Sequence, residues 1–226
     1  MNKMEAPVSL TRAAYERLRA DLLAGEWKPQ RKLPMHELRQ RYMLGASPLR
    51  EALNSLASEG LVVHNDQRGF SVAQVTLEQL RDLVRTRIAL ESLALTQAFD
   101  HRTLQWEEEL VLAFHRLSRA QRSSQPDSFK ENWAWEQLHR AFHTALLKAC
   151  DSPVLLGFCE ELYDKAHRYR QLAACKAYKR RNELGEHRAL FDAVMGKRLE
   201  EAIHLLALHY QRTADIIEKS SYGNDD

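Results

Sequence analysis

The sequence is poor in cysteine and contains no long apolar run, and these two absences exclude several classes of protein. Its three cysteines, Cys150, Cys159 and Cys175, are odd in number and lack Cys-x-x-Cys spacing, so neither a disulfide framework nor a thiolate zinc site is expected. The sequence lacks any stretch of about 18 uncharged apolar residues, and no apolar segment follows the N-terminal charges. We therefore expect reduced thiols, mostly buried, no membrane partner and a cytoplasmic location.

A strong charge of either sign is also missing from the chain as a whole. The formal net charge is +2 over 226 residues, with 44% hydrophobic and 28% charged residues, a composition typical of a globular protein with a packed core. Residues 1–72 contain 11 Lys/Arg and 8 Asp/Glu, whereas the remainder contains 22 and 23. Any polyanion partner should therefore bind the N-terminal part.

The first 74 residues follow the element order of a winged helix-turn-helix. Apolar residues at helical spacing predict helices over 10–23 and about 36–42. A third helix is predicted to run to about Glu59, with Ser47 as its N-cap and Pro48 as its first residue. Two apolar runs, 61–63 and 70–72, flank a polar segment with Gly69 and predict a β-hairpin. The third helix keeps its apolar stripe for the core and leaves its outer face free to contact a partner.

No strand pattern recurs beyond residue 75. Breaks at 100–103, 123–128, 151–153, 173–178 and 196 separate roughly six amphipathic helices. Tryptophans Trp106, Trp133 and Trp135 are expected in the core. The predicted fold is mainly α, with an N-terminal winged helix-turn-helix at 1–74 and a C-terminal antiparallel α-helical bundle at 75–226.

The motifs resemble those of the GntR family of transcriptional regulators. The N-terminal resemblance rests on the run Pro48-Leu49-Arg50-Glu51-Ala52-Leu53, together with Leu22-Leu23-Ala24-Gly25, Lys32-Leu33-Pro34, Glu37-Leu38, Glu59-Gly60-Leu61-Val62 and Arg68-Gly69. The second part is similar to the all-helical FCD effector-binding domain of the FadR-type branch, through Arg87-Ile88-Ala89-Leu90-Glu91, Ala141-Phe142-His143, Glu186-His187 and His209. The resemblance implies a homodimer that binds a pseudo-palindromic operator and responds to a small carboxylic acid. A repressor is expected, because release by an effector needs only a change in half-site spacing.

Six residues are candidates for DNA contacts. Ser47 and Arg50 lie at the start of the recognition helix, which enters the major groove by its N-terminal end. A guanidinium there can bind guanine bidentately or hold a phosphate. The candidate phosphate contacts are Lys32, Arg39, Arg41 and Arg68. The alternative for each is ordinary surface charge. The family often has arginine where this chain has Ala46, so we expect base readout to be reduced or shifted.

Four histidines are candidates for a metal site in the helical domain. His139 and His143 are four residues apart, so their rings share one helix face. The resemblance places His187 and His209 where metal-binding family members have histidines, and it places His139 where those members have an aspartate. A set of four imidazoles suits zinc or nickel. The alternative is a metal-free pocket whose histidines bind an anion directly.

Arg87 is the candidate for effector binding, because the resemblance places an arginine there whose planar fork can hold a carboxylate. Its alternative role is an ion pair with Glu91 at i+4. Arg168 and Arg170 could do likewise, and the sequence does not choose between them. The rival functions are a helical-bundle metalloenzyme using the four histidines and a protein-interaction module. The metalloenzyme leaves the winged helix unexplained, so no enzyme activity is expected.

Overall fold

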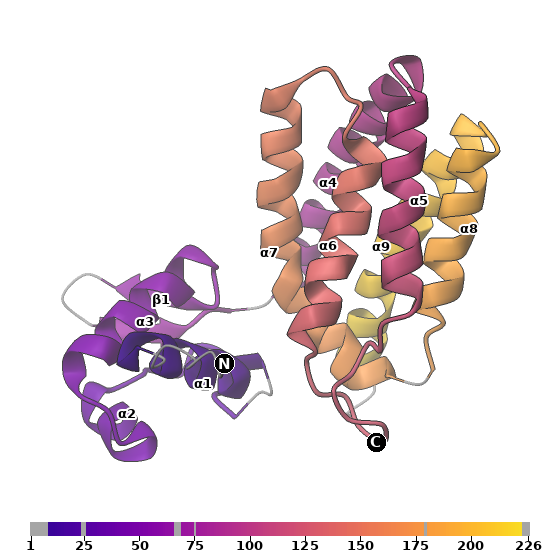
Figure 1. The fold of residues 1–226 in the computed structure, drawn as a ribbon. Helices are drawn as coiled ribbons and strands as arrows, with labels where there is room; N and C mark the ends of the chain where they lie inside the picture. Colours follow the sequence, from indigo (N-terminus) through magenta and orange to yellow (C-terminus); the bar gives the residue numbers. More distant parts are fainter. Residues whose placement is uncertain (1–8, 24–25, 66–68, 75, 179, 223–226) are drawn as a thin grey trace, which may run out of the picture. The chain divides into compact units, whose positions relative to one another are not determined.

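The computed structural model describes residues 9–23, 26–65, 69–74, 76–178 and 180–222, with side chains as far as residue 219. The chain forms two compact units, residues 1–76 and 77–226. Figure 1 labels their helices and strands.

The N-terminal unit is a three-helix domain with a small antiparallel sheet. Its elements are α1 (Leu10–Leu23), α2 (Met35–Tyr42), α3 (Ala46–Ser58), β1 (Val62–Asn65) and β2 (Gly69–Val72). Strands β1 and β2 pair with Val62 opposite Val72 and Asn65 opposite Gly69. The segment before α2 adds to this sheet, because Lys32 forms a bridge with Ser71 and the Leu33 amide donates to the Phe70 carbonyl at 2.8 Å. The predicted hairpin is therefore present, with an additional pairing segment that its short apolar pattern did not indicate.

Helix α3 lies between the core and the outer surface of this unit. Its buried residues Leu49, Ala52, Leu53 and Leu56 pack mainly against α1, where Ala14 and Leu18 are fully buried. This is the apolar stripe expected from the sequence, and it leaves the opposite face of α3 exposed.

The start of α3 differs from the prediction. Gly45 is the N-cap residue and makes no side-chain cap, so Ser47 lies inside the first turn, where its hydroxyl contacts Glu51 at 3.4 Å. Pro48 is accordingly the third helical residue and not the first. Proline is tolerated there because the first four amides of a helix have no partner within the helix.

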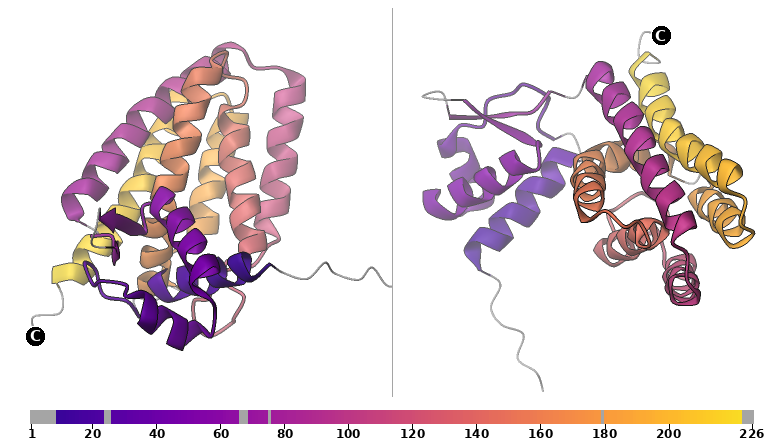
Figure 2. Two further views of the ribbon diagram at one scale, coloured as in Figure 1. Left: turned by 90° about the vertical axis from the view of Figure 1, so that its left-hand side faces the viewer. Right: turned by 90° about the horizontal axis from the view of Figure 1, so that it is seen from above.

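The C-terminal unit is an all-helical bundle. Its helices are α4 (Leu77–Asp100), α5 (Leu104–Ser118), α6 (Trp133–Leu147), α7 (Pro153–Ala177), α8 (Glu183–Met195) and α9 (Leu199–Tyr222). Consecutive helices run in alternating directions along the bundle (Figures 1 and 2). Helix α4 packs on α7 and α9, while α5 packs on α6 and α8. None of the described helices is long and apolar enough to cross a membrane.

Two details of this bundle depart from the sequence analysis. Helix α7 continues to Ala177, beyond the break predicted from residue 173, because its alanines favour helix and Ala173 and Ala177 are buried in the bundle. Trp106 and Trp135 belong to the core as expected, but Trp133 is 60% exposed at the first position of α6. The cysteines form no disulfide among the described residues, and Cys175 is exposed.

Candidate metal centre and DNA-binding surface

The outer face of α3 and the sheet form a groove with basic side chains. Arg50 and Asn54 from α3, Lys32 from the segment that pairs with β2, and His64 from β1 line this cavity of about 590 Å³. Arg50 is exposed and forms no hydrogen bond or ion pair with the other described residues, so its guanidinium is available to a ligand. The structure thus brings Arg50 and Lys32 together, and it adds Asn54 and His64, whose wing position gave no signal in the sequence.

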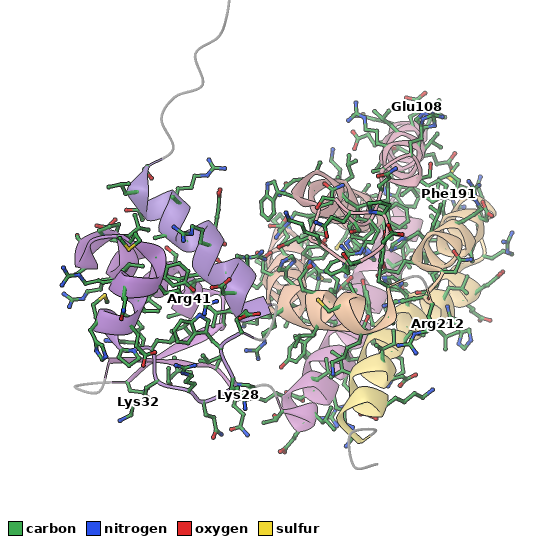
Figure 3. The ribbon with its side chains drawn as sticks, turned by 90° about the horizontal axis from the view of Figure 1, so that it is seen from below. Lys28, Lys32, Arg41, Glu108, Phe191 and Arg212 are labelled. Atoms are coloured by element: carbon green, nitrogen blue, oxygen red, sulfur yellow. The ribbon has the colours of Figure 1, made fainter. Side chains whose placement is uncertain are left out.

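The other predicted DNA contacts that the structure describes do not line this groove. Arg41 is engaged inside the unit, where it forms ion pairs with Asp21 at 2.9 Å and Glu26 at 3.4 Å. Arg39 and Ser47 are exposed but do not line the groove. Arg68 lies outside the described residues. Figure 3 labels Lys32 and Arg41 on the N-terminal unit.

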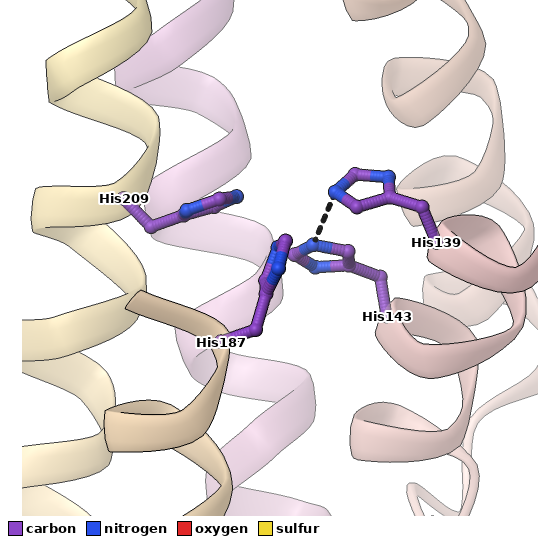
Figure 4. A group of neighbouring side chains, drawn as sticks. All are labelled: His139, His143, His187 and His209. Atoms are coloured by element: carbon purple, nitrogen blue, oxygen red, sulfur yellow. Dashed lines mark hydrogen bonds between the residues drawn. The ribbon is translucent and has the colours of Figure 1, made fainter. Parts of the chain in front are cut away.

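The four predicted metal-ligating histidines converge in the C-terminal unit. His139 and His143 come from α6, His187 from α8 and His209 from α9. Their candidate ligand atoms all lie within 4.8 Å of one another, and each residue is at most 4% exposed. Figure 4 shows the four rings turned toward a common point, with the Nε2 atoms of His139 and His143 3.2 Å apart.

Hydrogen bonds orient three of these rings from behind. Nδ1 of His139 contacts the Tyr163 hydroxyl at 2.7 Å, and Nδ1 of His209 contacts the Glu186 carboxylate at 2.7 Å. Nδ1 of His143 contacts the Tyr210 hydroxyl at 3.2 Å, and that hydroxyl donates to Glu91. A carboxylate accepts hydrogen bonds, so the contact with Glu186 favours the Nδ1–H tautomer of His209. The Tyr210 hydroxyl donates its own hydrogen bond to Glu91, so it accepts one from Nδ1–H of His143. The Nε2 atoms of His143 and His209 therefore keep their lone pairs for the centre of the cluster.

Burial sets the charge of the cluster. Loss of hydration, followed by the proximity of the other imidazoles and of buried arginines, lowers the pKa of His139, His143 and His209 well below the ordinary 6.5. Loss of hydration also lowers the pKa of His187 to about 4, against the opposing effect of Glu183 and Glu186. All four imidazoles are therefore neutral at pH 7, which is the protonation state that binds metal ions.

The residues present fit a divalent metal ion. Nε2 of His187 is buried without a hydrogen-bond partner among the described residues, and an unsatisfied buried nitrogen is costly unless something binds it. Two nitrogens on one tetrahedral ion at about 2.05 Å each are separated by about 3.3 Å, close to the 3.2 Å between His139 and His143. Glu136, three residues before His139, is held by Arg122 and Gln171 and belongs to a separate group with Glu131 and His167.

Arg87 forms the ion pair with Glu91 that was the alternative to an effector contact, and its Nη2 atom has no hydrogen-bond partner among the described residues. Its Nε atom donates to Glu91 at 2.8 Å, and its guanidinium lies 3.9 Å from the Tyr210 ring centroid. Both members of the ion pair are nearly inaccessible, at 3% and 2% exposure. Through Glu91 and Tyr210 the pair supports His143 from behind. Of the two alternatives, Arg170 is buried and donates to the Tyr163 carbonyl, while Arg168 contacts Tyr169.

The hydrogen-bond partners of the histidines were missed by sequence reasoning. Glu186 is adjacent to His187 in sequence but contacts His209, and Tyr210 is adjacent to His209 but contacts His143. Neighbouring residues of a helix point in different directions, so position in the sequence did not indicate these contacts. Tyr163 comes from α7, and its contact with His139 depends on the packing of two helices. Arg181 likewise reaches across to hold Glu186 at 2.8 Å and the His209 carbonyl at 2.9 Å.

Together, the winged helix and the helical bundle place the chain in the class of DNA-binding proteins that join a winged helix to an all-helical domain. The chain belongs to the GntR family of bacterial regulatory proteins and carries an FCD domain: residues 10–72 match "Bacterial regulatory proteins, gntR family" and residues 82–212 match "FCD domain". It is therefore a DNA-binding transcriptional regulator and not an enzyme.

Similar proteins cover nearly the whole chain. The uncharacterized HTH-type transcriptional regulator BphR of Paraburkholderia xenovorans is 36% identical over 93% of this chain and 86% of its own length. The HTH-type transcriptional repressor GlaR of Escherichia coli is 31% identical over 93% of this chain and 96% of its own. The solved structure of E. coli McbR/YncC has a TM-score of 0.63 at 25% identity, covering 95% of this chain and 99% of that one.

Proposed function

We propose that this regulator is a homodimeric repressor whose operator affinity is changed by a small carboxylic acid, and that His139, His143, His187 and His209 hold a zinc or nickel ion at the effector site. The convergence of these four buried histidines within 4.8 Å carries the proposal. The neutral nitrogen donors suit these borderline metals better than magnesium or calcium, which prefer oxygen.

A metal ion in this cluster would supply a positive charge for the effector. The donor set contains four neutral imidazoles and no carboxylate, so the two charges of the ion would not be neutralised by its ligands. A carboxylate from outside is the natural complement to such an ion. Glu186 and Glu91 lie outside the set of metal ligands. Glu186 orients His209 directly, and Glu91 orients His143 through the Tyr210 hydroxyl.

In the proposal, residues 1–74 read DNA and residues 75–226 bind the effector and dimerise. Arg50 and Lys32 contact DNA from the groove beside α3, with Ser47, Arg39 and Arg68 as further contacts. Arg41 contributes mainly through its ion pairs with Asp21 and Glu26.

The repressor assignment draws on the relative GlaR, which is named a transcriptional repressor. A dimer presents two DNA readers to two half-sites, so the operator should be an inverted repeat. An effector that changes the spacing of the readers lowers affinity without touching DNA.

Selection of duplexes from a random DNA library tests the DNA-reading part. We expect the purified protein to enrich an inverted repeat and to bind it with an affinity that falls steeply as salt rises. A small carboxylate, added to metal-loaded protein, should weaken that binding. Enrichment of no common sequence, or an affinity independent of salt, would refute the operator; tighter binding with every carboxylate tried would refute effector-released repression.

A further inference from the structure

The first turns of α7 present an exposed apolar surface. Helix α7 lies at one edge of the bundle, where it packs on α4, α6 and α9 (Figures 1 and 2). Val154, in its first turn, is 71% exposed, and Phe158, one turn later, is 52% exposed. Residues four apart on a helix share one face, so these two side chains form a single patch that the described part of the chain leaves largely in water.

Gly157 lies beside this patch, in the fifth position of the 25-residue helix. Glycine weakens a helix relative to alanine, because it loses more backbone freedom on folding. A Cβ atom built on Gly157 would meet no atom of the described residues within 4 Å, so packing inside that part of the chain does not account for the glycine. A second helix that crosses α7 here would account for it, because glycine lets another backbone approach closely.

The neighbouring helix α4 extends the apolar area. The Cys150 thiol donates to the Gln97 side chain at 3.0 Å, which sets this side of α4 beside the start of α7. Leu93, one turn before Gln97 on the same side of α4, is 50% exposed. A stable interface covers about 800 Å² on each partner, which is more than one helix face supplies, so a surface that continues onto a second helix favours association.

Charged side chains flank the patch in an order that suits a second copy of this chain. Asp151 precedes Phe158 by seven residues and Lys165 follows it by seven, and both are exposed. A two-fold axis near Phe158, relating two antiparallel α7 helices, therefore sets Asp151 of each copy opposite Lys165 of the other. Within one chain, Lys165 has a weak exposed contact with Glu161 at 4.0 Å. Across the axis, Glu161 comes near the first turn of the second α7, whose positive end favours a carboxylate.

We infer that α7 forms the dimer interface, with Val154, Gly157 and Phe158 of one copy packed against the same residues of a second copy. This rests on the homodimer of the proposed function and adds the surface through which the dimer forms. The interface is isologous, with an apolar centre and an Asp151–Lys165 pair on each side of the axis.

The position of this interface connects the metal cluster to the dimer. Tyr163, five residues after Phe158 on α7, contacts Nδ1 of His139 at 2.7 Å. A shift of α7 when an effector binds at the cluster would therefore move the interface, and with it the spacing of the two DNA readers.

Disulfide cross-linking of the full chain tests the interface. Gly157→Cys, made together with Cys175→Ser, places one thiol per copy next to the axis, where two Cα atoms come within the roughly 4.4 to 6.8 Å that a disulfide needs. With oxidised glutathione we expect a cross-linked dimer. The wild type is the matched control, because its exposed Cys175 lies 18 residues further along α7, about 27 Å from the axis. A dimeric Gly157→Cys protein that forms no cross-link would overturn the inference.

Light scattering over a dilution series tests the apolar centre. Phe158→Glu should raise the dimer dissociation constant about tenfold or more. Leu104→Glu, at an α5 residue that is 72% exposed, is the control and should leave the constant unchanged. Both variants should keep the wild-type metal content. A Phe158→Glu protein as dimeric as the wild type would refute the interface and leave the patch to another occupant, such as the winged helix of the same chain.

Charge exchange tests the pairing of the two copies. Lys165→Glu should weaken the dimer, because it sets two carboxylates opposite each other, and adding Asp151→Lys should restore it. Lys176→Glu, near the end of the same helix, should change nothing. No recovery in the double variant would refute the two-fold pairing and leave the proposed function intact. A wild-type protein that is monomeric at every concentration would instead refute the homodimer of the proposed function.

Discussion

The charge and tautomer of each clustered histidine follow from what surrounds it, and not from its own chemistry. An isolated imidazole on a helix surface titrates near 6.5 and can place its proton on either nitrogen. Here burial keeps the rings neutral, and Glu186 and the Glu91–Tyr210 pair keep the protons of His209 and His143 on Nδ1. The neutral, oriented rings therefore suit the metal ion that we propose for this cluster.

Replacement of Tyr163 by phenylalanine tests this orientation. The change removes the hydroxyl 2.7 Å from Nδ1 of His139 while preserving the ring that packs beside it. We expect zinc affinity to fall about ten- to hundredfold, as for other losses of a partner behind a metal ligand. Competition with a chromophoric chelator measures it, and Tyr178→Phe, at the end of the same helix, is the matched control. Equal affinities in the two variants would contradict a role for Tyr163.

The buried histidines also make the stability of the metal-free protein depend on pH. The unfolded chain takes up a proton at each histidine near pH 6.5, whereas the folded His187 does so only near pH 4. Between these values the unfolded state binds more protons, so stability is fully present above pH 6.5 and is lost as the pH falls toward 4. The pKa values of His139, His143 and His209 are lowered too and act in the same direction.

Urea unfolding of metal-free protein at pH 7.5 and pH 5.0 measures this effect. His187 alone accounts for a loss on the order of 2 kcal/mol between pH 6.5 and 5. His187→Gln should reduce the pH dependence of the free energy of unfolding. A free energy of unfolding that is constant or higher at pH 5.0 would show that the histidines are not neutral and buried in the folded state.

At the scale of elements, much of the fold could be predicted, because the spacing of apolar residues and the residues that break helices and strands are local features of the sequence. The apolar stripe of α3, the hairpin after it and the positions of the six helices that follow were all indicated by residues close in sequence. The N-cap of α3 and the end of α7 were misplaced, since Ser47 is a good cap residue in isolation and helix ends are the least determined by pattern. The convergence of histidines from α6, α8 and α9 was predictable only through the family resemblance. Their partners Tyr163 and Arg181 were not predictable, because those contacts depend on how separate helices pack.

Replacement of Arg50 by alanine tests α3 as the DNA-reading element. Arg50 lies in the groove with Lys32 and is free of the other described side chains, so its loss should cost about 1 to 3 kcal/mol of specific binding and relax the selected sequence at one position. Arg41→Ala, on the adjacent helix, should instead lower thermal stability and leave sequence preference unchanged, because Arg41 is paired with Asp21 and Glu26. Fluorescence anisotropy on selected and scrambled duplexes separates the two. An Arg50→Ala protein with undiminished preference would remove Arg50 from the base contacts.

On the scale of the whole molecule, the distribution of charge between the two units is compatible with the separate roles proposed for them. The basic surplus belongs to the first 72 residues, and the remainder is close to neutral. In the proposed function, a neutral sensor does not compete for DNA, so an effector bound there can alter operator binding without changing the electrostatic attraction of the readers.

Light-scattering of the purified protein tests the assembly that this division needs. We expect a mass near twice the 26.2 kDa of one chain, because a single DNA reader cannot occupy both halves of an inverted repeat. Enrichment of half-sites by a monomer would contradict the dimer.

Elemental analysis of protein purified without chelators or a metal-affinity column tests the central claim, that the four histidines form the metal centre of the effector site. About one zinc or nickel ion per chain is expected, with its loss in a His143→Ala, His187→Ala double variant and its retention in a His115→Ala, His204→Ala control. A wild-type protein that is metal-free as purified and binds neither added zinc nor added nickel, yet still binds its selected operator, would contradict the metal centre and leave a regulator that senses its effector with the histidines alone.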